Sequence, residues 1–273
     1  MTRGTGDTDD LLGTARQMRR NIVKMTTNAG SGHPGGALSA VEILASLFFG
    51  ELRHRPHEPS WSGRDRFIIS KAHACAVLYA ALAQSGYFPE EELMTYRKIN
   101  SRLQGHSHLE TPGVEMSGGS LGMGLSFGVG TALASRIDGR DSRTYVLVGD
   151  GECDEGEIWE AAMAASNYNL DNLMAFIDRN RIQNDRFTAE VMDLEPLPDK
   201  WRAFGWNTLE INGHEFPEIL SALDEARATR GKPTAVIAHT VKGKGVSFME
   251  NNPDYHGKVA TEEQLVKALE EIG

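Results

Sequence analysis

Short apolar runs recur along the chain, and polar or turn-forming residues bound each of them. Almost every position within a run is apolar, which is typical of strands that are buried on both faces of a parallel sheet. This pattern predicts strands at residues 66–70, 144–150, 172–178, 206–211 and 234–240.

The stretches between these runs have helical periodicity. Near the N-terminus, apolar side chains recur every three or four residues, and two glycines follow the end of the pattern. The apolar positions are Leu11, Ala15, Met18, Ile22 and Met25, and the glycines are Gly30 and Gly32. Further helices are predicted at "AHACAVLYAALAQSG", "GEIWEAAMAASNY", "FPEILSALDEARATRG" and "TEEQLVKALEEIG", the last with Thr261 as its N-cap.

Strands and helices therefore alternate, which predicts a doubly wound α/β fold with a mostly parallel sheet and helices on both faces. No linker is long enough to divide the chain, so we expect a single domain over residues 1–273. Long loops are expected at residues 50–65, 98–118, 181–198 and 241–260. Loops of this length in a compact domain are often functional.

Composition and charge narrow the class of protein. The chain has 273 residues, 40% of them hydrophobic, and a formal net charge of −10. This acidic balance argues against a nucleic-acid partner, because phosphate backbones attract clustered Lys and Arg. The two cysteines, Cys75 and Cys153, exclude a disulfide scaffold and favour a reducing compartment. With no signal-peptide pattern and no apolar run near the roughly 20 residues of a membrane helix, we expect a cytoplasmic protein with no membrane partner.

Two of the predicted strands end in residues that suit a metal-bound diphosphate. Asp150 lies between Gly149 and Gly151 at the end of one strand, and Asn180 follows the next. Ligands of open α/β sheets bind at the carboxyl ends of the strands. A carboxylate, an amide oxygen and a backbone carbonyl suit Mg²⁺, which takes its other oxygens from water and phosphate. The alternative is an ordinary Gly-Asp-Gly turn whose aspartate caps a helix.

The glycines of residues 118–134 only loosely resemble a dinucleotide fingerprint. No clear strand precedes them, and no acidic residue ends a strand about 20 residues further on, so nicotinamide binding is rejected. These glycines either bring a helix N-terminus close to a cofactor or admit a neighbouring helix, and the segment alone does not distinguish the two. The segment "VKGKGVS" lacks the strand-to-helix context of a P-loop.

Several histidines lie beside glycine or proline at the predicted ends of elements. They are His33, His73, His106, His108 and His256. Such ends converge on one crevice in this fold class. His106 and His108 could form a zinc pair, but no further spaced Cys or His completes a site. Histidines that donate hydrogen bonds and carry protons around a polyhydroxylated substrate fit better.

Together these segments resemble the N-terminal third of transketolase, the thiamine-diphosphate enzyme that moves two-carbon ketol units between sugar phosphates. The resemblance extends from about residue 11 to 270 and rests jointly on "SGHPGGALSAVEIL", "DRFIISKAHA", "GHSHLETPGVEMSGGSLGMG", "GDGECDEGEIWEAA", "LMAFIDRNRIQ", "PLPDKWRAFGWNTLEINGH" and "HTVKGKGVSFMENNPDYHGK". The Gly-Asp-Gly to Asn unit alone would indicate only a thiamine-diphosphate enzyme, a class that includes 2-oxo-acid dehydrogenases.

The resemblance implies a role for each matching residue. Mg²⁺ would be bound by Asp150, Asn180 and the carbonyl of Ile182. The residues implied to contact or approach thiamine diphosphate are Gly151, His73 and His256 at the diphosphate, Gly119 and Leu121 along the rings, and Lys71 and Lys242 near the pocket. The residues implied to meet the sugar oxygens are His33, His106 and His256.

Glu155 and Glu160 resemble acids that pair across the family's dimer interface, although glutamates in a first helical turn are also favoured by the helix dipole. The sequence departs from the family at Ala72, where Gly is usual, and at "GSLGMG", where "GPLGQG" is commoner. Neither change removes an implied ligand, but Met123 and the altered polarity of this loop could change the fit of the substrate.

The family's pyrimidine-binding domain, with the glutamate that activates the cofactor, has no counterpart in this sequence. We therefore expect the N-terminal subunit of a split transketolase that is active only with a separate pyrimidine-binding subunit, in a heterotetramer with two of each chain. It would transfer a two-carbon ketol unit from a ketose phosphate to an aldose phosphate. Thiamine diphosphate would serve as the electron sink, and histidines would polarise oxygens.

Two other interpretations stay open. One is a related two-chain enzyme of specialised metabolism with another acceptor, such as a carrier protein. The other is a non-catalytic, cofactor-binding assembly partner, which the presence of Asp150, Asn180 and the histidines disfavours. A 2-oxo-acid dehydrogenase chain is disfavoured because "SGHPGG" and the His106 loop fit sugar substrates better.

Overall fold

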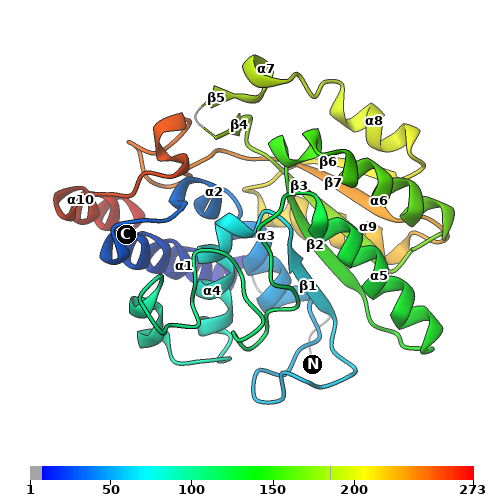
Figure 1. Cartoon of the computed structure of the whole chain (residues 1–273), viewed down its shortest axis with the longest axis horizontal. Helices are drawn as coiled ribbons and strands as arrows, with labels where there is room; N and C mark the ends of the chain where they lie inside the picture. Colours follow the sequence, from blue (N-terminus) through cyan, green and yellow to red (C-terminus); the bar gives the residue numbers. More distant parts are fainter. Residues whose placement is uncertain (1–7, 185) are drawn as a thin grey trace.

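A five-stranded parallel sheet, in the order β1-β2-β3-β7-β6, forms the centre of the protein (Figure 1). The computed structural model describes residues 8–184 and 186–273. The strands of the sheet are β1 (Arg66–Ile69), β2 (Thr144–Gly149), β3 (Leu173–Arg179), β6 (Asn207–Asn212) and β7 (Thr234–His239). A separate antiparallel pair consists of β4 (Ile182–Gln183) and β5 (Arg186–Phe187). The predicted parallel α/β sheet is confirmed.

Helices cover both faces of the sheet, and successive residues of each strand serve opposite layers. Tyr145 and Leu147 of β2 pack into one apolar cluster, whereas Val146 and Val148 pack into the other. The first cluster contains residues of α1 (Thr8–Ala29), α3 (Val41–Ser46), α4 (Cys75–Gln84) and α9 (Phe216–Ala228). The second contains residues of α5 (Met123–Ile137), α6 (Gly156–Asn167) and α8 (Leu197–Ala203).

Short helical segments lie mainly in the connections. They are α2 (Pro34–Leu38), α7 (Thr188–Val191), a π-helical turn (Leu47–Glu51) and 3₁₀ turns at Ala72–Ala74, Glu90–Thr95, Gly151–Asp154 and Pro253–His256. The last helix, α10 (Glu262–Ile272), begins with a capping box between Thr261 and Gln264, as its N-cap residue predicted. No helix in the described part of the chain is both long and apolar enough to cross a membrane.

Two of the expectations were wrong in detail. The strand predicted at residues 206–211 is not buried on both faces, because β6 is an edge strand and most of its side chains are half-buried or exposed. The loops predicted at residues 181–198 and 241–260 contain regular structure, namely β4, β5 and α7 in the first and a 3₁₀ turn in the second. Short polar elements of this kind lack the long periodicity that predicts helices and strands.

Close packing explains two glycines of α5. A Cβ atom on Gly128 would lie 2.6 Å from Cγ2 of Val146 in β2, and one on Gly124 would lie 2.5 Å from Ser70. The helix therefore lies directly on the sheet, from the end of β1 at Gly124 to the first half of β2 at Gly128. These two glycines permit close packing, as one of the two interpretations expected, but the neighbour is the sheet rather than another helix.

Substituting Gly128→Ala should destabilise the chain by about 1–3 kcal/mol, because the new methyl group overlaps Val146 in a packed core. Gly130→Ala is the matched control in the same helix: a Cβ there meets nothing within 4 Å, so helix propensity should stabilise by roughly 0.5–1 kcal/mol. Urea unfolding of both variants measures the difference, and equal effects would contradict this packing.

Candidate functional site

The functional residues gather at the carboxyl ends of β1, β2 and β3, where a cavity of about 240 Å³ opens. Asp150 follows β2 and Asn180 follows β3, and the two strands are hydrogen-bonded neighbours with Gly149 opposite Asp178. Parallel neighbours end at the same edge of a sheet, so the two side chains meet there. The predicted site residues that line the cavity are His33, Lys71, His73, Gly119, Leu121, Asp150, Gly151, Asn180, Ile182, Lys242 and His256.

Asp150 and Asn180 present oxygen atoms to this cavity. The Asp150 carboxylate accepts hydrogen bonds from the backbone N–H groups of Gly151 (2.8 Å) and Arg181 (2.5 Å). Burial and the nearby carboxylate of Asp178 raise the pKa of Asp150 to about 6. A bound cation would reverse this effect by stabilising the ionised carboxylate.

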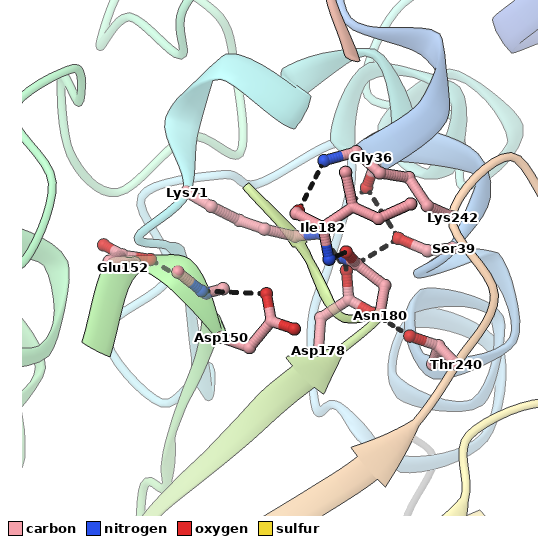
Figure 2. Close-up of polar contacts among 12 residues, drawn as sticks. Gly36, Ser39, Lys71, Asp150, Glu152, Asp178, Asn180, Ile182, Thr240 and Lys242 are labelled. Atoms are coloured by element: carbon pink, nitrogen blue, oxygen red, sulfur yellow. Dashed lines mark hydrogen bonds and ion pairs between the residues drawn. The ribbon is translucent and has the colours of Figure 1, made fainter. Parts of the chain in front are cut away.

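Asp178 is fully buried and lies at the centre of a polar network (Figure 2). It forms an ion pair with Lys71 and accepts hydrogen bonds from Thr240, Ser39 (2.6 Å) and the Asn180 amide nitrogen (2.8 Å). Burial acts to raise its pKa, but the Lys71 ammonium and the hydrogen bonds outweigh burial and hold the pKa below its ordinary value. Because Nδ2 of Asn180 is held by Asp178, its Oδ1 is the atom left for a ligand and for the N–H of Ile182 (3.1 Å).

Lys242 connects two of the predicted ligands. Its ammonium donates to the Ile182 carbonyl (2.8 Å) and lies 2.8 Å from Nδ1 of His256. Burial and the charge of Lys71 lower the pKa of Lys242 to about 8. A carbonyl oxygen has two lone pairs, so this hydrogen bond leaves Ile182 able to take a second partner.

His33, His73 and His256 form a compact group whose ring centroids are 5.2–5.3 Å apart. Burial is the main cause that lowers the pKa of His33 to about 4 and that of His256 to about 3, and it lowers the pKa of His73 as well. These imidazoles are therefore neutral near pH 7. Among the described residues, Nδ1 of His33 is one of the buried side-chain atoms without a hydrogen-bond partner, so its hydrogen-bonding capacity is unmet in this structure.

The structure places the other predicted residues outside the cavity lining. His106 is exposed, and its ring centroid lies 6.4 Å from that of His33. Glu155 and Glu160 are exposed at the start and in the middle of α6. In the described ranges, 8–184 and 186–273, no group of three or more His, Cys, Asp or Glu side chains could hold a metal ion. A cation here would depend on the mixed carboxylate, amide and carbonyl set.

Sequence reasoning missed two buried acids of the site, Asp178 and Glu152. Asp178 ends an apolar strand run, and its burial beside Lys71 depends on the pairing of β3 with its neighbours. Glu152 looked like one of several glutamates near a helix start, yet only 3% of its surface is exposed and it lines the cavity. An acid at the end of an otherwise apolar run was the available signal for Asp178.

The comparison with known families agrees with this geometry. Residues 12–273 match the family described as "Transketolase, thiamine diphosphate binding domain". The chain belongs to the transketolase family. It is thus a chain of a thiamine-diphosphate-dependent transferase, and the cavity lies in a domain of the type that binds this cofactor.

Two similar proteins match along nearly their whole length. The chain is 45% identical over 264 residues to the 6-deoxy-6-sulfo-D-fructose transketolase subunit SqwG of Clostridium sp. (strain MSTE9), with 96% of each chain covered. It is 46% identical over 254 residues to an apulose-4-phosphate transketolase subunit of Phocaeicola vulgatus, covering 93% of this chain and 90% of that protein.

Among solved structures, transketolase from Campylobacter jejuni subsp. jejuni superposes with a TM-score of 0.93 at 34% identity. The match covers 98% of this chain and 43% of that chain, so the chain spans less than half the length of this solved transketolase. The expected fold is therefore confirmed as that of the transketolase thiamine-diphosphate-binding domain.

The residues present fit a metal-bound diphosphate. Hard oxygen donors (Asp150, Asn180 and the Ile182 carbonyl) face basic side chains that an anion would neutralise. Gly151 fits the same picture, because a Cβ atom there would lie 2.4 Å from Cβ of Gln183 and displace that wall of the cavity.

The pKa of Asp150 predicts how magnesium binding depends on pH. Below about pH 6 this carboxyl is mostly protonated in the absence of a cation, so a cation bound here would lose its one charged protein ligand. Magnesium with pyrophosphate should raise the Tm more at about pH 7.5 than at about pH 5. Asp150→Asn is the control and should show smaller Tm shifts with a weaker pH dependence, namely the part that comes from titration of the pyrophosphate itself. The same pH dependence in both proteins would contradict the assignment.

Proposed function

We propose that this chain is the diphosphate-binding subunit of a split transketolase, active only with a separate pyrimidine-binding subunit. The enzyme transfers a two-carbon ketol unit from a ketose phosphate to an aldose phosphate. The observation that carries the proposal is the cavity in which Asp150, Asn180 and the Ile182 carbonyl face a group of half-buried histidines and two buried lysines. The relatives that are named as transketolase subunits support the two-chain arrangement.

Within this proposal, Asp150, Asn180 and the Ile182 carbonyl hold Mg²⁺, and the cation anchors the diphosphate. Thiamine diphosphate, when bound, supplies the electron sink for carbon–carbon bond cleavage. His73 provides a hydrogen bond to the diphosphate, the ring of His256 contacts it, and Lys242, which donates to the Ile182 carbonyl, lies on the cation side of the cavity. Gly119 and Leu121 lie along the rings of the cofactor.

The histidines act on the sugar. The Lys242 ammonium donates to Nδ1 of His256, so the proton of this neutral imidazole is on Nε2, which donates towards the substrate. The imidazole of His33, which lines the cavity, exchanges a proton with a sugar hydroxyl. His106, at the exposed mouth, hydrogen-bonds the sugar further from the cofactor.

A second candidate function differs only in the sugar. The relatives at 45–46% identity are named for 6-deoxy-6-sulfo-D-fructose and for apulose 4-phosphate, which are ketoses with an anionic group. These names favour a specialised ketose with an anionic end as the donor. A third possibility is transfer to another acceptor, such as a carrier protein, which would use the same cavity residues to cleave the donor. An activity assay with different acceptors distinguishes it from the two functions above.

The outer face of α5 and α6 is the surface proposed to bind the pyrimidine-binding subunit. The exposed apolar residues of this face are Met123, Phe127 and Ile137 of α5, and Met163 and Tyr168 at α6. Figure 1 shows the two helices side by side on one side of the sheet. The proposed interface acids Glu155 and Glu160 lie on the same helix, α6. An apolar face of this kind beside exposed carboxylates is typical of a protein interface.

We also propose that residues 1–273 form a single domain and that two copies of each subunit make a heterotetramer. The enzyme is proposed to work in the cytoplasm without membrane or nucleic-acid partners. The pair of interface acids supports the tetramer, because such acids would meet across a dimer of heterodimers.

Phe127→Glu should prevent the chain from co-purifying with its partner, because it places an unpaired charge in the centre of the proposed apolar interface. Ile99→Glu is the matched control. Ile99 is 92% exposed in a loop distant in sequence from α5, so this variant should bind normally. Pull-down of the partner from the native host measures both, with circular dichroism as the test of folding. Equal binding by both variants would place the interface elsewhere.

The function itself is tested on the complex recovered from the native host. With thiamine diphosphate and Mg²⁺, the complex should transfer a ketol unit from xylulose 5-phosphate, or from a sulfonated or branched ketose, to ribose 5-phosphate. Asp150→Ala should lower the rate on the order of a hundredfold or more by loss of the cation.

The isolated chain is the control and should be inactive. Donor cleavage without transfer to ribose 5-phosphate would indicate a different acceptor. Activity from the isolated chain would show that no second subunit is needed, and a complex that binds the cofactor but cleaves no ketose would indicate an assembly partner.

A further inference from the structure

Glu152 is buried beside the proposed cation site. Its carboxylate accepts hydrogen bonds from backbone N–H groups and a hydroxyl group, and no Lys or Arg of the described chain forms an ion pair with it. One of its oxygens accepts hydrogen bonds from Ser70 Oγ (2.5 Å) and the N–H of Gly122 (2.9 Å). The other oxygen accepts from the N–H of Gly149 (2.9 Å). Figure 2 shows Glu152 at the edge of the cluster next to Asp150, away from Asp178.

The two backbone donors belong to different walls of the cavity. Gly149 ends β2 and precedes Asp150, so it lies on the wall that would hold the cation and the diphosphate. Gly122 ends the loop that carries Gly119 and Leu121, which lie on the wall along the cofactor rings. One carboxylate therefore spans the two walls.

The two walls differ in the contacts, other than those with Glu152, that hold them in place. Gly149 is held by the ladder between β2 and β3 whether or not Glu152 is present. The loop before α5 is held at its beginning by the hydrogen bond from the Gly118 N–H to the Ser107 carbonyl (3.0 Å). At its end, Gly122 has φ = +86°, a left-handed conformation, and its N–H is held by Glu152. The position of the ring wall thus depends on Glu152, whereas the diphosphate wall does not.

We infer that Glu152 is a positioning residue that sets the separation between the ring-binding loop and the cation–diphosphate anchor. The inference rests on the proposed function for the identity of the cofactor. It predicts that loss of the bridge weakens binding of the whole cofactor but not of its diphosphate end. A buried acid that merely stabilised the fold would affect both ligands equally.

Glu152→Gln tests this separation. A side-chain amide has one oxygen, and its NH₂ group cannot accept from an N–H, so the variant cannot bond both Gly122 and Gly149. In the complex, affinity for thiamine diphosphate with Mg²⁺ should fall about tenfold, the scale of one lost hydrogen bond to a charged group. Affinity for pyrophosphate with Mg²⁺, measured by titration calorimetry, should change less than about twofold, because its ligands are untouched.

Ser70→Ala is the matched control. It removes the hydroxyl donor but leaves the bridge between Gly122 and Gly149, so both affinities should stay close to those of the unsubstituted complex. If Glu152→Gln does not fold, Glu152→Asp keeps the charge but is one methylene shorter, and it should show the same divergence between the two ligands. Equal losses for both ligands, or no loss for either, would overturn the inference.

Hydrogen exchange separates a failure of this inference from a failure of the proposed function. In the unsubstituted chain without ligand, the amides of Gly122 and Gly149 should both be protected. In Glu152→Ala, which removes both acceptor oxygens, the Gly122 amide should exchange at least about tenfold faster if the loop is released. If the complex binds no thiamine diphosphate, the proposed function fails, and unchanged exchange at Gly122 would overturn the positioning role as well.

Discussion

The ion pair between Lys71 and Asp178 is the interaction on which the rest of the site depends. Both side chains are almost completely buried. The Lys71 ammonium also donates to the Gly36 carbonyl, and the Asp178 carboxylate also accepts from Ser39, Thr240 and Asn180. These two charged groups thus contact four segments, namely the ends of β1, β3 and β7 and the helix α2. Removing one partner from a buried pair costs roughly 3–5 kcal/mol, because the remaining charge is left uncompensated. Such a pair therefore holds these four segments in one arrangement.

The same burial gives the cavity its electrostatic character. Basic side chains from separate segments line it, and burial lowers the pKa values of His33, His256 and Lys242. Near pH 7 the histidines are therefore neutral without a ligand, whereas Lys242, with a pKa of about 8, is still mostly protonated. An anion reverses this effect by favouring the protonated forms. The cavity therefore suits a diphosphate, because its negative charges stabilise the protonated side chains that burial has removed from water. Asp150 is the complementary case, since a cation favours its ionised form.

The sheet fixes the relative positions of the two side chains that are proposed to bind the cation. Asp150 and Asn180 project from neighbouring strands whose register is set by backbone hydrogen bonds, with Gly149 opposite Asp178. Second contacts then orient each ligand: the Arg181 N–H for Asp150, and Asp178 for the amide of Asn180. Glycines at the cavity edge keep the backbone close, as at Gly151. Outside the cavity, several large apolar side chains of α5 and α6 are exposed to solvent.

Much of the fold could be predicted from the sequence, because the spacing of apolar residues and the positions of turn-forming residues are local properties of the chain. The strands β2, β3 and β7, the helices α1 and α10 and the cap at Thr261 were all visible as patterns. Asp150, Asn180 and the histidines were visible because they interrupt those patterns at the ends of elements. Tertiary structure alone decided that β6 is an edge strand, that Asp178 is buried against Lys71, and that Glu152 spans two walls of the cavity. These facts depend on which strands become neighbours, and strand pairing joins residues far apart in the sequence, whose mutual distance no local pattern encodes.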